Sequence, residues 1–126
     1  MKLGSWANKK ILIVEDDDIS NEFFEEVLKP TKVKLLFAKE GKTAIQMCKD
    51  NPDIDIILMD IQLPVMDGQE AADEIRKINR DIIMIAQTAY AMSDDREKYL
   101  SSGFDDYISK PITPSRLLEL IGKYIY

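Results

Sequence analysis

The segment "KILIVEDDDISN" (residues 10–21) places four consecutive acids directly behind a run of apolar residues. Residues 11–14 are apolar and mostly β-branched, which predicts a buried strand. Apolar positions 19, 23, 24, 27 and 28 then predict an amphipathic helix that begins near Ile19. Asp17 and Asp18 suit the start of that helix, where carboxylates cap the backbone and favour the dipole. Glu15 and Asp16 remain as charges at the end of a buried strand, where repulsion is poorly screened.

The same succession of strand and helix repeats along the chain. Strands are expected at residues 10–14, 33–38, 55–58, 82–88 and 106–109, and helices at 19–29, 43–50, 69–78, 93–103 and 113–125. Ser93 and Gly103 are candidate caps of the fourth helix, and Thr113 and Pro114 mark the start of the fifth. Alternation of helices with strands that are apolar on both faces predicts a doubly wound α/β fold, with a five-stranded parallel sheet and helices on both faces.

Length and composition limit the domain organisation and the functions. The 126 residues are enough for one domain, expected at 9–126, with residues 1–8 as a flexible lead-in or a remnant outside it. A net charge of −6 argues against direct binding of nucleic acid. No apolar run or leader indicates a membrane or secretory segment, so a cytoplasmic location is expected.

Two residue counts narrow the chemistry further. The chain has no histidine and a single cysteine, Cys48. Histidine-based acid–base catalysis, the usual zinc sites and an internal disulfide are therefore excluded. Cys48 lies on an apolar helical stripe and is expected to be a small core residue.

The residues that follow the predicted strands share one edge of a parallel sheet. They are Glu15, Asp16, Asp60, Thr88 and Lys110. Two like charges about 5 Å apart repel by on the order of 3 kcal/mol at an effective dielectric near 20, so a cation has to offset the cluster or a pKa has to shift. Mg²⁺ suits carboxylate ligands, and a carboxylate beside a metal ion, a lysine and a hydroxyl can accept a phosphoryl group.

The chain resembles the receiver domains of two-component response regulators over about residues 9–126. The resemblance rests on the acidic pair Glu15-Asp16, "MDIQLPVMDG" (residues 59–68), Thr88-Ala89 and Lys110-Pro111. Each motif is weak alone, but their order and spacing are highly specific. The resemblance implies a flavodoxin-like fold with strand order 2-1-3-4-5.

Roles at the metal and phosphoryl site follow from this resemblance. It implies that Asp60 is the phosphoacceptor and that Asp16 and Asp60 bind Mg²⁺ through their side chains. Gln62 would contribute its backbone carbonyl, and Glu15 would act through a bound water. Lys110 would bind a phosphoryl oxygen.

Roles in switching also come from the resemblance. Thr88 would move to donate a hydrogen bond to the phosphoryl group, and Tyr107 would turn inward with it. Pro111 is expected to follow a cis peptide bond that orients the preceding lysine. Gln62 and Tyr90 resemble the variable positions that tune the lifetime of the phosphoryl group, and the bulky Tyr90 predicts slow autodephosphorylation.

The predicted function is a phosphoacceptor domain of a two-component system or phosphorelay. Its phosphodonor would be a histidine kinase or a histidine phosphotransfer domain, because the chain has no histidine of its own. Phosphorylation would change the surface formed by the fourth helix, fifth strand and fifth helix, where a downstream partner or a second copy of the chain would bind. No direct contact with a membrane is expected. The chain would not be an enzyme beyond transfer to itself and autodephosphorylation.

Two alternatives remain. One is a Mg²⁺-dependent phosphatase with an aspartyl phosphate, but such hydrolases usually carry a second acid two residues after the nucleophile, where this chain has Gln62. The other is a pseudo-receiver that binds partners without phosphorylation, which the intact set of acids, threonine and lysine disfavours. The segment 59–68 and the asparagine of "DISN" resemble receivers fused to hybrid histidine kinases.

Overall fold

A computed structural model of the chain describes residues 5–89, 97, 98, 100 and 102–125. The predicted cap Ser93 and most of the predicted helix at 93–103 lie outside the described residues. The described elements, in chain order, are β1 (Lys10–Val14), α1 (Asp18–Leu28), η1 (Lys29–Thr31), β2 (Lys34–Ala38), α2 (Gly41–Asp50), β3 (Ile56–Asp60), α3 (Gly68–Ile78), β4 (Ile83–Thr88), β5 (Asp106–Ser109) and α5 (Pro114–Gly122).

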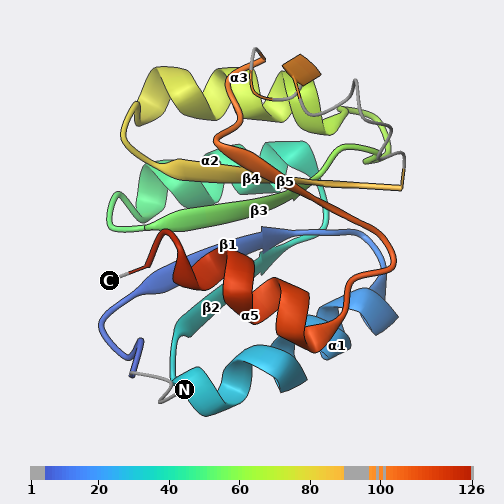
Figure 1. Cartoon of the computed structure of the whole chain (residues 1–126). Coiled ribbons are helices and arrows are strands. Elements are labelled where there is room, and N and C mark those ends of the chain that lie inside the picture. The colour runs from blue at the N-terminus through green and yellow to red at the C-terminus, as the bar shows by residue number, and fades with distance from the viewer. Residues whose placement is uncertain (1–4, 90–96, 99, 101, 126) are drawn as a thin grey trace.

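The strands form one parallel sheet in the order β2-β1-β3-β4-β5 (Figure 1). β1 pairs with β2 on one side and with β3 on the other, with Val14 opposite both Ala38 and Met59. The strand order therefore reverses at β1 and β3, and ligands of doubly wound folds bind beyond the carboxyl ends of the strands at such a reversal. The predicted flavodoxin-like fold is confirmed.

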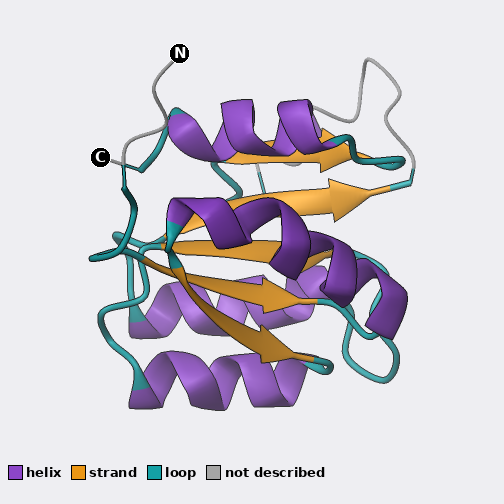
Figure 2. Cartoon of the chain, turned by 90° about the horizontal axis from the view of Figure 1, so that it is seen from below, coloured by secondary structure: helices purple, strands orange, loops and turns teal. Residues whose placement is uncertain are grey.

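Helices cover both faces of the sheet (Figure 2). α2 and α3 pack on one face and α1 and α5 on the other, so each face has its own hydrophobic core. β1 supplies Leu12 and Val14 to the first core and Ile11 and Ile13 to the second, and all four are fully buried. Burial on both faces explains why the strand sequences are continuously apolar rather than alternating.

Side-chain caps fix where three helices begin, next to the carboxyl ends of the strands. The Asp17 carboxylate accepts a hydrogen bond from the backbone N–H of Ser20 at 3.2 Å. Asp67 caps α3 and Thr113 caps α5 in the same way. These caps satisfy backbone donors that have no partner within the helix. The predicted caps Asp17 and Thr113 are confirmed.

The observed boundaries differ by a few residues from the predicted ones. β3 ends at Asp60 rather than at residue 58, because Asp60 pairs with Gln87 of β4 in the sheet. α5 ends at Gly122, three residues early, where glycine is a poor helix former. None of the described helices is both long and apolar enough to cross a membrane.

Trp6 belongs to the core although it precedes the predicted domain. Trp6 is only 9% exposed, packs in the core under α1 and α5, and donates its backbone N–H to Thr31. The packed part of the chain therefore begins before residue 9.

Cys48 is buried as predicted, and burial raises the pKa of its thiol to about 11.

Candidate functional site

Three carboxylates meet beyond the carboxyl ends of β1 and β3. One oxygen from each of Glu15, Asp16 and Asp60 lies within 4.8 Å of the other two. Pairing of β1 with β3 brings them together, since Glu15 directly follows β1 and Asp60 ends β3. Glu15 is 1% exposed and Asp60 5%, whereas Asp16 is exposed. The predicted acidic cluster therefore exists and opens to solvent on the side of Asp16.

Lys110 supplies positive charge to this cluster from the end of β5. Its Nζ lies 3.1 Å from Oε1 of Glu15 and 3.5 Å from Oδ2 of Asp60. The backbone N–H of Lys110 donates to the carbonyl of Thr88, so β4 holds the lysine in place across the sheet. The Lys110–Pro111 peptide bond is cis, as the resemblance implied.

Burial and the charges of the cluster together shift two pKa values. Burial, followed by the neighbouring carboxylate of Asp60, raises the pKa of Glu15 to about 7, against the opposing attraction of Lys110. For Lys110, burial lowers the pKa, but attraction to Asp60 and Glu15 outweighs it and the net pKa is raised. The attraction of Lys110 is therefore too weak to offset the burial of Glu15 beside Asp60, and the pKa of Glu15 stays raised.

The donor set fits a hard divalent cation. All three candidate ligands are carboxylate oxygens, and Mg²⁺ binds one or two carboxylates while keeping several waters. The exposed side of Asp16 leaves room for those waters, and the chain has no histidine to favour a softer metal. The residues present therefore suit Mg²⁺, with Asp16 and Asp60 as the predicted side-chain ligands.

Backbone groups hold the carboxylate of Asp60. The N–H of Gln62 donates to Oδ1 of Asp60 at 2.9 Å, while Oδ2 faces Lys110. Gly68 passes so close that a Cβ on it would lie 2.3 Å from the carbonyl oxygen of Asp60. Its N–H donates to the carbonyl of Ile61, which closes the loop between β3 and α3. The metal-binding role of the Gln62 carbonyl stays a prediction.

The predicted switch residues lie on the neighbouring strands β4 and β5. Thr88 is 2% exposed at the end of β4, and Tyr107 is partly buried against the core under α2 and α3. Tyr107 pairs with Ala86, two residues before Thr88, so the two side chains belong to neighbouring strands. Their coupled movement stays a prediction. Tyr90, the other predicted lifetime position, lies outside the described residues.

Three residues near the site were not assigned a role from the sequence. Asn21 of α1 donates its side-chain N–H to the carbonyl of Glu15 at 3.0 Å. Gly68 ends the motif at residues 59–68, and its close approach to Asp60 demands the absence of a side chain. Gln87 lies in the predicted strand at 82–88, where it is the single polar residue before Thr88. That interruption of an apolar run is the sequence signal that distinguishes Gln87 from the rest of the strand.

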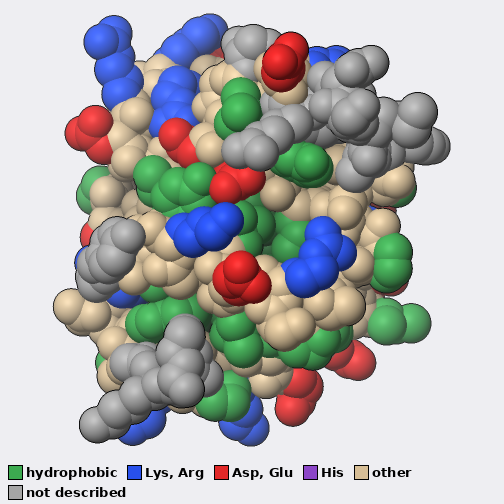
Figure 3. All heavy atoms as spheres, in the orientation of Figure 1, with side chains coloured by type: hydrophobic (Ala, Val, Ile, Leu, Met, Phe, Trp, Pro, Cys, Tyr) green, Lys and Arg blue, Asp and Glu red, His purple; other side chains and the backbone are tan. Residues whose placement is uncertain are grey.

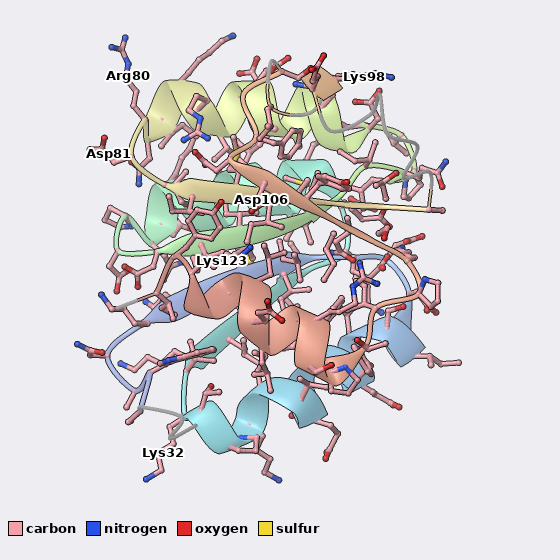
Figure 4. The ribbon with its side chains drawn as sticks, in the orientation of Figure 1. Lys32, Arg80, Asp81, Lys98, Asp106 and Lys123 are labelled. Carbon is pink, nitrogen blue, oxygen red and sulfur yellow. The ribbon has the colours of Figure 1, made fainter. Side chains whose placement is uncertain are left out.

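The opposite end of the sheet has a different character. Lys32, Arg80 and Asp81 lie in the turns that precede β2 and β4, at the end away from the acidic cluster (Figure 4). Among the described residues, the candidate functional side chains named above lie at the other end of the sheet, where the strands have their carboxyl ends.

Residues 11–122 match the family model of the response regulator receiver domain. The chain belongs to this family. The receiver domain is 38% identical over 125 residues to hybrid signal transduction histidine kinase I of Dictyostelium discoideum, covering 93% of this chain but 7% of the kinase. It is 34% identical over 119 residues to the polar-differentiation response regulator DivK of Brucella anthropi, covering 93% of this chain and 96% of DivK.

Solved structures also resemble the receiver domain. One is a co-crystal structure of the Saccharomyces cerevisiae histidine phosphotransfer protein Ypd1 and the receiver domain of its downstream response regulator Ssk1. A chain of it aligns with a TM-score of 0.87 and 30% identity, covering 98% of this chain and 91% of that chain. The receiver domain of the Pseudomonas aeruginosa sensor histidine kinase PA1611, solved with magnesium coordinated in its active site cleft, aligns with a TM-score of 0.83 and 33% identity, covering 93% of this chain and 97% of that chain.

Proposed function

We propose that this receiver domain accepts a phosphoryl group on Asp60 from a phosphohistidine of another protein, in a Mg²⁺-dependent step. The observation that carries the proposal is the arrangement of Asp60, which lies within 4.8 Å of two other carboxylates and 3.5 Å from the Lys110 ammonium. Such a carboxylate has both the cation ligands and the fixed positive charge that phosphoryl transfer requires. The magnesium in the related PA1611 receiver supports the assignment.

In the proposed transfer, an oxygen of Asp60 forms a new bond to phosphorus while the bond from phosphorus to the imidazole nitrogen breaks. The imidazole nitrogen keeps the electron pair, and the product is an aspartyl phosphate. Bound Mg²⁺ would neutralise charge on the phosphoryl oxygens. The Gln62 N–H holds Oδ1 of Asp60, which leaves Oδ2 on the side of Lys110. Lys110 would then exchange part of its contact with the carboxylates for a phosphoryl oxygen.

The proposed phosphodonor is a histidine kinase or a histidine phosphotransfer domain. The similarity to the crystallised complex of Ypd1 with the Ssk1 receiver supports the second kind of partner. The proposed response is a rearrangement of Thr88 and Tyr107 that alters the face around β5 and α5 for a downstream partner or a second copy of the chain. Membership of a hybrid histidine kinase and a cytoplasmic location both stay predictions.

The test is phosphorylation by acetyl phosphate with Mg²⁺, followed by intact mass. We expect an adduct of one phosphoryl group in the wild-type domain and none in Asp60→Asn. An adduct that persists in Asp60→Asn would overturn the assignment, and absence of an adduct in the wild type would favour the pseudo-receiver. Many turnovers of a generic phosphomonoester per molecule would favour the phosphatase.

A further inference from the structure

Asp16 lies in the bend between β1, which ends at Val14, and α1, which begins at Asp18. It is the exposed member of the acidic cluster and, with Asp60, a predicted side-chain ligand of Mg²⁺. A ligand on a bend loses conformational freedom when it binds a cation, and this loss weakens binding unless the bend is already held in place. The contacts of the residues on either side of Asp16 therefore matter for the metal site.

Asn21 of α1 contacts the residues on both sides of Asp16. Its side-chain Nδ2–H donates to the carbonyl of Glu15 at 3.0 Å. Its backbone N–H donates to the carbonyl of Asp17 at 3.1 Å. Because both donors belong to one helical residue, they tie the two ends of the bend that carries Asp16 to the same point of α1.

The side-chain bond of Asn21 does not serve the helix itself. The start of α1 is already capped by Asp17, whose carboxylate accepts from the N–H and the hydroxyl of Ser20. A cap accepts from helical N–H groups, whereas Nδ2 of Asn21 donates to a carbonyl that precedes the helix. Oδ1 of Asn21 is buried and has no hydrogen-bond partner among the described residues. An apolar side chain would avoid this unpaired acceptor, so the bond to Glu15 is what the amide contributes.

The peptide bond between Glu15 and Asp16 is held at both of its polar atoms. Its carbonyl accepts from Asn21, and its N–H donates to Oε2 of Glu15 at 3.0 Å. The N–H of Glu15 in turn donates to the carbonyl of Ala38, at the end of β2. Of these contacts, the one with Asn21 fixes the bend without using a carboxylate oxygen. It therefore leaves the carboxylates free to engage a cation.

We propose that Asn21 is a positioning residue for the Mg²⁺ site, whose hydrogen bonds hold the bend so that the carboxylate of Asp16 stays within 4.8 Å of that of Asp60. The proposal rests on the Mg²⁺ site of the proposed function but does not need phosphoryl transfer. Removal of a group that orients metal ligands from outside typically weakens metal binding by roughly 10- to 100-fold. Loss of the Asn21 amide should therefore weaken Mg²⁺ binding although no ligand is removed.

The test is titration with MgCl₂, followed by the backbone amide shifts of Asp16 and Asp60 in two-dimensional NMR. Asn21→Leu removes the donor at a similar volume and should raise the Kd for Mg²⁺ about tenfold. Asn51→Leu is the matched control at the end of α2, because Nδ2 of Asn51 also donates to a backbone carbonyl, that of Met47, at 2.9 Å. It should leave the Kd unchanged. Asp and Glu side chains lie among Lys and Arg side chains on the face that carries α5 (Figure 3), and salt at about 0.15 M limits weak binding of Mg²⁺ to such scattered charges.

A second measurement separates positioning from a general loss of structure. Urea unfolding of both variants in EDTA measures how much stability each hydrogen bond contributes. If Asn21 only stabilises the fold, Mg²⁺ affinity should fall in both variants in step with their stability, whereas positioning confines the loss of affinity to Asn21→Leu. An unchanged Kd in Asn21→Leu, or an equal rise in the two variants, would overturn the proposal. Asn21→Ala provides the same comparison if the leucine variant does not fold.

Failure of this proposal can be distinguished from failure of the phosphoacceptor role. At saturating Mg²⁺, Asn21→Leu should be phosphorylated by acetyl phosphate as fast as the wild type, because Asp60 and Lys110 are unchanged. A rate that stays lower at saturation would contradict a role limited to the metal site. A wild type that binds Mg²⁺ but gains no phosphoryl group would refute the phosphoacceptor role alone, and a wild type that binds no Mg²⁺ would refute both.

Discussion

Replacement of Glu15 by glutamine should change how the stability of the domain depends on pH. Burial raises the pKa of Glu15 from its ordinary value of 4.5 to about 7 in the folded state. Between these values the folded domain holds a proton that the unfolded chain has lost, so stability falls as pH rises. Below 4.5 both states are protonated, and above about 7 both are ionised, so the loss is confined to this interval. The free energy of unfolding should fall by roughly 3 kcal/mol across this interval.

The assay is urea unfolding in EDTA from pH 4.5 to 8, because the chelator removes any divalent cation. With a slope of roughly 1.5 kcal/mol per molar urea, the wild-type midpoint should fall about 2 M relative to Glu15→Gln across this range. Comparison of the two proteins cancels the titration of other carboxylates. Glu26→Gln, at an exposed position of α1, should follow the wild type. Parallel curves for the wild type and Glu15→Gln would refute the assignment of a proton to the buried carboxyl.

Further predictions concern the same site. Mg²⁺ at about 100 times its Kd should stabilise the domain by roughly 2.7 kcal/mol in thermal unfolding at pH 8, and Asp16→Asn should weaken this gain; an unchanged Tm with Mg²⁺ would argue against a metal site. Gly68→Ala should lower the free energy of unfolding by roughly 1 to 3 kcal/mol and slow phosphorylation by acetyl phosphate, because the added Cβ would press on the backbone of Asp60. Gly122→Ala, which has open space around its Cβ, should have neither effect. Equal behaviour of the two variants would contradict this reasoning. Lys110→Met should lower the urea midpoint more at pH 8 than at pH 5, because Glu15, with a pKa of about 7, is largely protonated at the lower pH and loses its ion pair with Lys110 there. An equal loss at both pH values would be inconsistent with an ion pair between Lys110 and Glu15.

Local patterns explain most of what the sequence predicted correctly. Whether a residue caps a helix depends on neighbours three positions away, and Asp17 meets Ser20 in this way. The order of strands and helices follows from apolar spacing within each segment. The acid that ends β3 could be recognised because it interrupts a buried run. By contrast, the exact end of β3 depends on the pairing of Asp60 with Gln87, a residue of another strand.

The sequence thus determined the class of the fold and the chemical types gathered at the strand ends, since both rest on contacts within a few residues. Only the tertiary structure decided how these groups meet. Lys110 lies 95 positions from Glu15 in the chain, and their ion pair at 3.1 Å exists because β1, β3, β4 and β5 align their carboxyl ends. The raised pKa of Glu15 depends on burial by neighbours from several elements. For the same reason the buried oxygen of Gln87, which has no hydrogen-bond partner among the described residues, could be recognised only in three dimensions. The groups that surround a buried amide come from other segments of the chain.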